Sequence, residues 1–148
     1  MKDDVTRSGR CHCGAVSWTF DGAVQWACYC HCDDCRRTCA APVVGWLGVH
    51  VQGFRWTGQA PRTRESSPGV LRHFCAGCGT PMAFEATHYP GGMHLYAGTL
   101  DAPETFEPTF HVNYQSKLPW LLMADDLPKY NGTLREAAPD LGRYDTEA

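Results

Sequence analysis

Cysteines are the side chains of this sequence most suited to chemistry, and eight of the nine fall in close-spaced groups. The densest group spans residues 28–35 and places four thiols and one imidazole within eight positions. Two pairs flank it in sequence, Cys11 with Cys13 and Cys75 with Cys78. Such short spacings, together with an odd number of cysteines, favour metal binding over disulfides. The sequence therefore predicts a metal-binding protein.

The two flanking pairs each resemble half of a tetrahedral zinc site. A glycine follows the second cysteine of each pair, Gly14 and Gly79, where the backbone of a metal knuckle must turn tightly. Four thiolates leave no vacant position on zinc, so a site formed by Cys11, Cys13, Cys75 and Cys78 is expected to be structural. The alternative is that one pair binds a metal together with the middle group.

The middle group offers three sulfurs, from Cys30, Cys32 and Cys35, and no second pair remains to complete them. Three protein ligands with an exchangeable fourth position are typical of a catalytic zinc. A fourth protein ligand could close the site instead, from Cys28, Cys39 or His31. Of these, Cys28 is favoured because it would share a strand face with Cys30. The spacing supports an open and a closed site equally.

The elements that must position these sulfurs are predicted to be mainly β. The chain has fifteen glycines, ten prolines and no long stretch of helical periodicity. Short strands are expected at 15–20, 24–32, 42–47, 53–57, 69–74, 81–85 and 93–100. Asp33 and Asp34 suit the start of a short helix whose first amides would face the preceding sulfurs and lower their pKa. The apolar segment 118–123 is expected to dock on the domain.

Length and charge narrow the class of protein. The 148 residues suit one domain, here 10–130, with a polar arm at 1–9 and a tail at 131–148. The polar start, and the lack of an apolar run of roughly 18 residues, predict neither a signal peptide nor a membrane partner, and hence a cytoplasmic protein. The net charge of −3 becomes more negative when thiolates hold zinc, which argues against a nucleic-acid partner.

Three ordered motifs carry a family resemblance. They are Gly-Arg-Cys-His-Cys-Gly-Ala-Val at 9–16, Cys-His-Cys-Asp-Asp-Cys-Arg-Arg at 30–37 and Phe-Cys-Ala-Gly-Cys-Gly-Thr at 74–80. Further matches at 98–101 and 118–120 extend the likeness over about residues 9–130. The sequence resembles the glutathione-dependent formaldehyde-activating (GFA) family, which includes centromere protein V. The resemblance implies a zinc-bound β-tent of antiparallel sheets, with a structural zinc on the flanking pairs and a second zinc on Cys30, Cys32 and Cys35.

The resemblance also implies carbon–sulfur lyase chemistry, in which glutathione and formaldehyde combine to S-hydroxymethylglutathione. Because a metal ion lowers the pKa of the group it binds, an open zinc on Cys30, Cys32 and Cys35 would hold a substrate thiol as a nucleophilic thiolate. The carboxylates of glutathione need cations, for which Arg36, Arg37, Arg64 and Arg72 are candidates, and Trp46 could wall a pocket. We expect a lyase with two zinc ions per chain that forms or cleaves an S-hydroxymethyl adduct of glutathione or a related small thiol.

Two other functions stay open. The first is a non-catalytic zinc protein, with a closed second site and a surface that binds a partner. The second is a chromatin-associated module like centromere protein V, which the acidic balance and the lack of a basic tail disfavour.

The histidines are not expected to bind metal. His73, His94 and His111 are expected to be hydrogen-bonded structural residues, and His31 is expected to lie between two ligands without being one.

Overall fold

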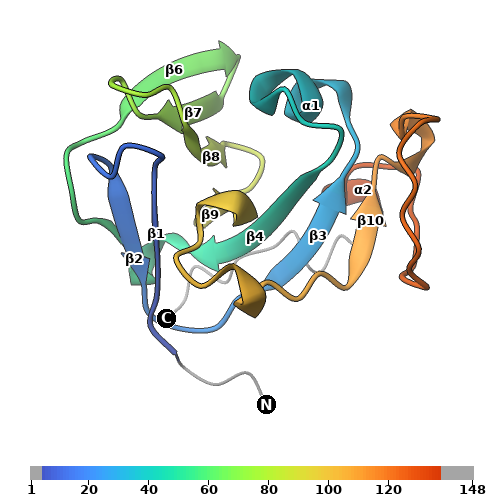
Figure 1. Cartoon of the computed structure of the whole chain (residues 1–148), viewed down its shortest axis with the longest axis horizontal. Coiled ribbons are helices and arrows are strands. Elements are labelled where there is room, and N and C mark those ends of the chain that lie inside the picture. The colour runs from blue at the N-terminus through green and yellow to red at the C-terminus, as the bar shows by residue number, and fades with distance from the viewer. Residues whose placement is uncertain (1–4, 138–148) are drawn as a thin grey trace.

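The computed structural model, which describes residues 5–137, consists mainly of two β-sheets (Figure 1). The small sheet has the order β1-β2-β5, formed by β1 (Arg7–Arg10), β2 (Ser17–Phe20) and β5 (Phe54–Trp56). The large sheet has the order β10-β3-β4-β9-β8-β7-β6. Its strands are β3 (Trp26–Cys30), β4 (Val44–His50), β6 (Arg62–Ser67), β7 (Val70–Phe74), β8 (Pro81–Ala86), β9 (Gly92–Tyr96) and β10 (Phe110–Val112). The prediction of a mainly β chain is confirmed.

Neighbouring strands are antiparallel except β10, which runs parallel to β3. The pairing is thus antiparallel, as expected, with one parallel pair at the edge of the large sheet. The helices are short: α1 (Asp33–Cys39), α2 (Leu134–Ala137) and the 3-10 turns η1 (Val51–Gly53), η2 (Ala97–Thr99), η3 (Pro103–Thr105) and η4 (Tyr114–Ser116). Among residues 5–137 no helix combines the length and apolar character that a membrane crossing requires.

The two faces of the large sheet bury different sets of side chains, because successive residues of a strand point to opposite sides. On one face the small sheet packs against the central strands, in a core that contains Trp18, Phe20, Leu47, Val49, Met82 and Leu95. The other face carries a second cluster with Trp26, Cys28, Cys30, Trp46 and Tyr96. The alternation along β4, from Trp46 to Leu47, thus separates a packed core from the face that holds the central cysteines.

Helix α1 begins where the sequence predicts, directly after Cys32. The Cys32 sulfur caps the helix, since it accepts a hydrogen bond from the backbone N–H of Cys35 at 3.3 Å. Asp33 and Asp34 lie in the first turn, where carboxylates interact favourably with the helix dipole. The helix ends at Ala40, which adopts a left-handed φ of 51° and bonds its N–H to the Arg36 carbonyl. The helix therefore fixes Cys32 and Cys35 one turn apart.

Three strands were not expected from the sequence. Strand β6 is exposed along its whole length, so its residues lack the alternation that marks a half-buried strand. Strand β10 has only three residues, which are too few to show an alternating pattern. Strand β1 begins within the predicted polar arm, at Arg7, and Ser8 of that arm binds Asp101 at 2.7 Å. The ordered domain thus begins before residue 10.

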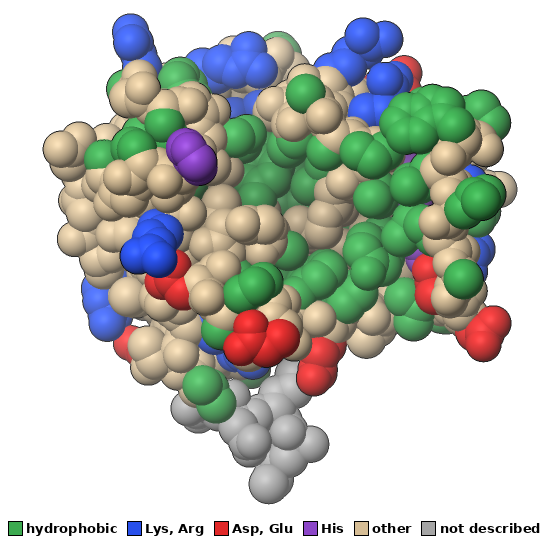
Figure 2. Space-filling view, in the orientation of Figure 1, with side chains coloured by type: hydrophobic (Ala, Val, Ile, Leu, Met, Phe, Trp, Pro, Cys, Tyr) green, Lys and Arg blue, Asp and Glu red, His purple; other side chains and the backbone are tan. Residues whose placement is uncertain are grey.

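The segment 118–123 does not dock as expected. Trp120 is 68 % exposed and Leu122 is 89 % exposed, whereas Leu118, Leu121 and Met123 are partly buried. On the face drawn in Figure 2, hydrophobic side chains gather over the loop that follows β10, while Lys and Arg side chains lie mainly along the upper edge. In the predicted tail, Leu134 of α2 is buried, and the rest of that tail from residue 138 lies outside the described residues, as do residues 1–4 of the predicted arm.

Gly9 is a position where any side chain should destabilise the fold. A Cβ there would meet the indole ring of Trp18 and lie 2.6 Å from the carbonyl oxygen of Thr99. We expect Gly9→Ala to lower the free energy of unfolding by about 1–3 kcal/mol, the usual cost of overpacking. Gly98→Ala is the matched control, since a Cβ there meets no atom within 4 Å. Chemical denaturation of both variants would measure this, and equal stabilities would contradict the packing argument.

Candidate metal centre and adjoining cavity

The two flanking cysteine pairs come together in space, although more than half of the domain separates them in sequence. The sulfurs of Cys11, Cys13, Cys75 and Cys78 all lie within 4.8 Å of one another. The Cys13 sulfur is 3.6 Å from that of Cys11 and 3.7 Å from that of Cys75. Four sulfurs around a zinc ion, with zinc–sulfur distances of about 2.3 Å, would be about 3.8 Å apart. The geometry of this cluster therefore fits a four-coordinate metal ion.

Both halves of this cluster are tight turns between antiparallel strands, one joining β1 to β2 and the other joining β7 to β8. Gly14 and Gly79 have φ of +81° and +80°. No atom lies within 4 Å of a Cβ built on either one, so the left-handed backbone and not a lack of space requires glycine. Thr80 joins the turns, because its hydroxyl accepts from the His12 N–H at 3.1 Å and contacts the Cys78 sulfur at 3.1 Å.

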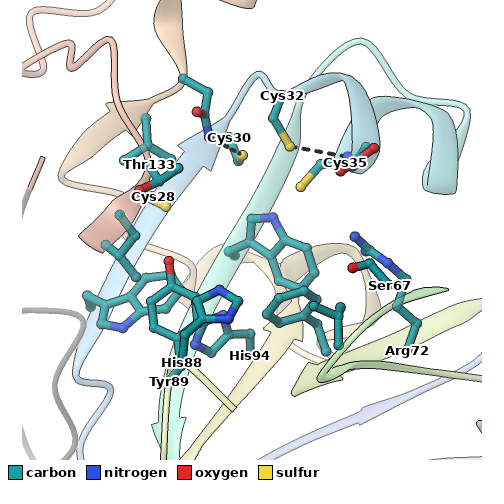
Figure 3. A pocket seen from close by; sticks show the side chains of 18 residues that line it. Cys28, Cys30, Cys32, Cys35, Ser67, Arg72, His88, Tyr89, His94 and Thr133 are labelled. Carbon is teal, nitrogen blue, oxygen red and sulfur yellow. Dashed lines mark hydrogen bonds between the residues drawn. The ribbon is translucent and has the colours of Figure 1, made fainter. Parts of the chain in front are cut away.

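The second cluster contains three sulfurs that also lie within 4.8 Å of one another, from Cys30, Cys32 and Cys35. Cys30 ends β3, while Cys32 and Cys35 belong to the cap and first turn of α1. Within residues 5–137, neither Cys28 nor His31 nor Cys39 is part of this group. Cys28 does share the buried strand face with Cys30, and Figure 3 shows its side chain set apart from the other three. The cluster is thus a three-sulfur site.

Electrostatic coupling concentrates the negative charge of this trio on Cys32. Hydrogen bonds from Cys30 and Cys35 lower the pKa of the Cys32 thiol to about 3. The same contacts act in the opposite direction on the partners: the ionised Cys32 raises the pKa of Cys30 to about 11, and the contact with Cys30 raises that of Cys35. A bound cation would have to displace the remaining protons, so metal binding at this site should weaken at low pH.

Hydrogen bonds from His31 to His111 and from His111 to Asp125 hold the Cys30–Cys32 segment in place. His31, which is 1 % exposed, lies 2.8 Å through Nε2 from Nδ1 of His111. The Nε2 atom of His111 in turn lies 3.0 Å from both carboxylate oxygens of Asp125. Because a carboxylate only accepts, His111 donates to Asp125 and accepts from His31. His31 is therefore a positioning residue between two candidate ligands.

Asn113 contacts the site, although no motif or spacing in the sequence pointed to it. It follows β10, adopts a left-handed φ of 51° and donates from Nδ2 to the Cys30 sulfur at 3.4 Å. Its backbone N–H bonds to the carbonyl of Gly132, which fixes its place. A hydrogen bond to a sulfur favours the thiolate form, so Asn113 supports Cys30 as a ligand.

A cavity of about 300 Å³ adjoins the trio. Figure 3 shows the three sulfurs along one side of it, with Tyr89, His88 and His94 on the opposite side and Arg72 and Ser67 at one end. The cavity is lined by these residues together with Trp26, Cys28, Asp34, Trp46, Val70, Phe84, Val112, Asn113, Thr133 and Leu134. The candidate cysteines therefore border a space that could hold a small molecule.

The candidate substrate-binding residues separate into two groups. Trp46 and Arg72 line the cavity. Arg36 and Arg37 lie on α1 and do not line it, and Arg36 pairs instead with Asp33 at 3.1 Å. Arg64 lies on the exposed strand β6 opposite Arg72. Of the four candidate arginines, only Arg72 lines the cavity beside the three sulfurs.

His73 and His94 both contact neighbouring side chains. His73 lies 2.6 Å from a Glu85 carboxylate oxygen and 2.7 Å from the Thr63 hydroxyl. His94 stacks on Phe84 with ring centroids 5.2 Å apart, at the floor of the cavity. Burial, with a smaller effect from His88, lowers the pKa of His94 to about 3. His94 is therefore neutral at physiological pH.

The lowered pKa of His94 predicts a pH-dependent stability. The unfolded chain binds a proton at His94 below about pH 6.5, whereas the folded chain does so only near pH 3, so acid favours unfolding over that interval. Each pH unit should cost about 1.4 kcal/mol from this residue. We expect the stability advantage of the wild type over His94→Gln to shrink by that amount per unit between pH 6 and pH 4. Denaturation at several pH values would measure it, and a constant difference would contradict the assignment.

Comparisons with known proteins agree with this geometry. The family model described as glutathione-dependent formaldehyde-activating enzyme matches residues 6–116. A Halomonas elongata protein, provisionally described as a glutathione-dependent formaldehyde-activating enzyme, is 26 % identical over 126 residues, which cover 76 % of this chain and 78 % of that protein. A crystal structure of a Rhodobacter sphaeroides protein shares the fold, with a TM-score of 0.53 and 20 % identity over 64 % of this chain and 88 % of that one. The chain belongs to the glutathione-dependent formaldehyde-activating (GFA) family.

Proposed function

We propose that this protein is a zinc-dependent carbon–sulfur lyase that forms or cleaves the S-hydroxymethyl adduct of glutathione or a related small thiol. Family membership supports the reaction class. The observation that carries the proposal is the trio of Cys30, Cys32 and Cys35, whose sulfurs lie within 4.8 Å of one another beside a cavity of about 300 Å³. Because thiolate ligands persist in a reducing compartment, we also infer a cytoplasmic location.

Two zinc ions per chain fit the donor sets. The four sulfurs of Cys11, Cys13, Cys75 and Cys78 would hold one ion in a structural role, because they fill a tetrahedral shell. Cys30, Cys32 and Cys35 would hold the other and leave its fourth position to the substrate. Zinc there would supply positive charge that keeps a thiol ionised at neutral pH. Asn113 and the His31–His111 contact would hold the trio in place.

The proposed reaction needs no oxidant or reductant. The substrate sulfur attacks the carbonyl carbon of formaldehyde, and a carbon–sulfur bond forms as the carbonyl electron pair moves to oxygen. The proton lost by the thiol ends on that oxygen, which gives the hydroxymethyl group. The reverse reaction breaks the same bond. The chain would contribute orientation, since the walls of the cavity fix the substrate beside the three sulfurs.

Zinc content tests the open site. We expect two zinc ions per wild-type chain, one for Cys32→Ser and two for Cys28→Ala, measured by elemental analysis of the purified protein. Cys39→Ala is the matched control, because Cys39 is the cysteine outside all three groups. Loss of one zinc in Cys28→Ala would instead mean that Cys28 closes the second shell, and would favour a non-catalytic zinc protein.

Activity can be measured directly by NMR exchange spectroscopy on formaldehyde mixed with a thiol. The zinc-loaded wild type should speed exchange between the free thiol and its hydroxymethyl adduct by more than about tenfold, a small part of what enzymes achieve. Cys32→Ser should lose this acceleration, whereas Cys39→Ala should keep it. If the wild type accelerates exchange no more than Cys32→Ser does, the protein is not a lyase for that thiol.

A further inference from the structure

The residues that line the cavity indicate which thiols it can bind. This inference rests on the proposed function as a carbon–sulfur lyase. We propose that the site takes a thiol with a compact aromatic body and a single carboxylate, in preference to glutathione. The sulfur would lie at the trio of Cys30, Cys32 and Cys35, the body against the aromatic floor and the carboxylate at Arg72. The argument rests on the size of the cavity, on its walls and on the placement of its only buried cation among the described lining residues.

The size of the cavity favours a compact molecule. Its volume of about 300 Å³ is at the lower end of the range for small-molecule sites, roughly 300–1,000 Å³. The space is shared between the sulfur end, the floor and the guanidinium end (Figure 3). A one-ring thiol needs less of this volume than a tripeptide does.

The floor and walls are aromatic. Trp46 lies edge-on to Phe84 with ring centroids 5.9 Å apart, and Trp26 lies edge-on to His94 at 4.8 Å. Phe84 and His94 stack at 5.2 Å. The rings of Trp26, Trp46, Phe84 and His94 form a part of the lining that contains no Lys, Arg, Asp or Glu side chain. Such a surface suits an aromatic ring, which can meet these rings edge to face or offset.

Arg72 is a buried cation whose side-chain hydrogen bonds both go to neutral hydroxyl groups. It is 8 % exposed, and its guanidinium donates to the Ser66 hydroxyl at 3.0 Å and to the Tyr96 hydroxyl at 3.3 Å. Its Cζ atom lies 5.2 Å from the centroid of the Phe84 ring. None of the ion pairs among residues 5–137 includes Arg72.

A buried guanidinium with spare donors and no carboxylate partner is a strong site for an anion, because burial increases the value of a charge-assisted hydrogen bond. Arg72 and Cys32 line the same cavity. A ligand could therefore place its sulfur at the trio and its carboxylate at Arg72 within one small molecule. The two groups that would recognise it lie at the same cavity.

Glutathione finds only one arginine or lysine for its two carboxylates among the described lining residues of the cavity. It carries two carboxylates, and Arg72 can meet one of them. Arg36 and Arg37 do not line the cavity, and Arg36 already pairs with Asp33. The charged side chain at the mouth is Asp34, which is exposed and would repel a second carboxylate. A thiol with one carboxylate avoids this cost.

Binding of three thiols to the zinc-loaded wild type, measured by isothermal titration calorimetry, tests the proposal. The probes are para-(mercaptomethyl)benzoate, its uncharged analogue para-methylbenzyl thiol, and glutathione. We expect the benzoate to bind about tenfold or more tightly than either of the others, as a buried charge-assisted hydrogen bond would provide. Glutathione binding as tightly as the benzoate, or no preference between the two aromatic thiols, would overturn it.

The substitution Arg72→Gln tests whether Arg72 binds the carboxylate of the benzoate. We expect it to lose the preference for the benzoate over the uncharged thiol while the uncharged thiol still binds, whereas Arg62→Gln, on the exposed strand β6, should keep the wild-type preference. An equal loss of both thiols in Arg72→Gln at full zinc content would overturn the role of Arg72. If Arg72→Gln does not fold, the comparison of the three thiols on the wild type still decides the substrate class.

NMR exchange with formaldehyde separates this proposal from the proposed function. Acceleration for glutathione but not for the benzoate would overturn the substrate class and leave the lyase in place. Preferential binding of the benzoate with no acceleration for any thiol would overturn the lyase and support the substrate class for binding alone. Acceleration for the benzoate above that for glutathione would support both.

Discussion

The structure depends on the convergence of four sulfurs from two turns that lie far apart in the sequence. One turn belongs to the small sheet and the other to the large sheet, so the cluster of Cys11, Cys13, Cys75 and Cys78 joins the two sheets at one point. A metal held there would close a loop that contains the central cysteines, and closing a long loop restricts the unfolded chain more than closing a short one. This cluster can therefore stabilise the scaffold without taking part in chemistry.

The alternation of side chains along the central strands gives the second cluster its surroundings. Leu47 and Leu95 face the small sheet, whereas Trp46 and Tyr96 face the other side, together with Cys28 and Cys30. The packed core lies on one face, so the opposite face can remain partly open without loss of the main apolar contacts. The cavity beside the trio is the result. Its aromatic floor comes from the same strands that hold the core.

Much of this arrangement could be predicted from local sequence. The knuckle glycines, the helix after Cys32 and several of the β-strands follow from turn chemistry, capping and alternation. Strand β6 could not, because its six exposed residues carry no periodic pattern. The segment 118–123 was expected to be buried because it is apolar, yet composition alone does not show which residues have a surface to pack against. Asn113 and Asp125 reach the site from distant segments, which no local spacing encodes.

The sequence by itself determined the donor types, their grouping into three close-spaced sets and membership of a family with this pattern. These features are local, because cysteines separated by only a few residues of chain stay close enough in space to bind the same ion. Only the tertiary structure decided which sets combine, that Cys28 lies outside the trio, and that Arg72 alone of the four candidate arginines lines the cavity. Those outcomes depend on strand register and on which face each side chain occupies, and pairing between distant strands sets both.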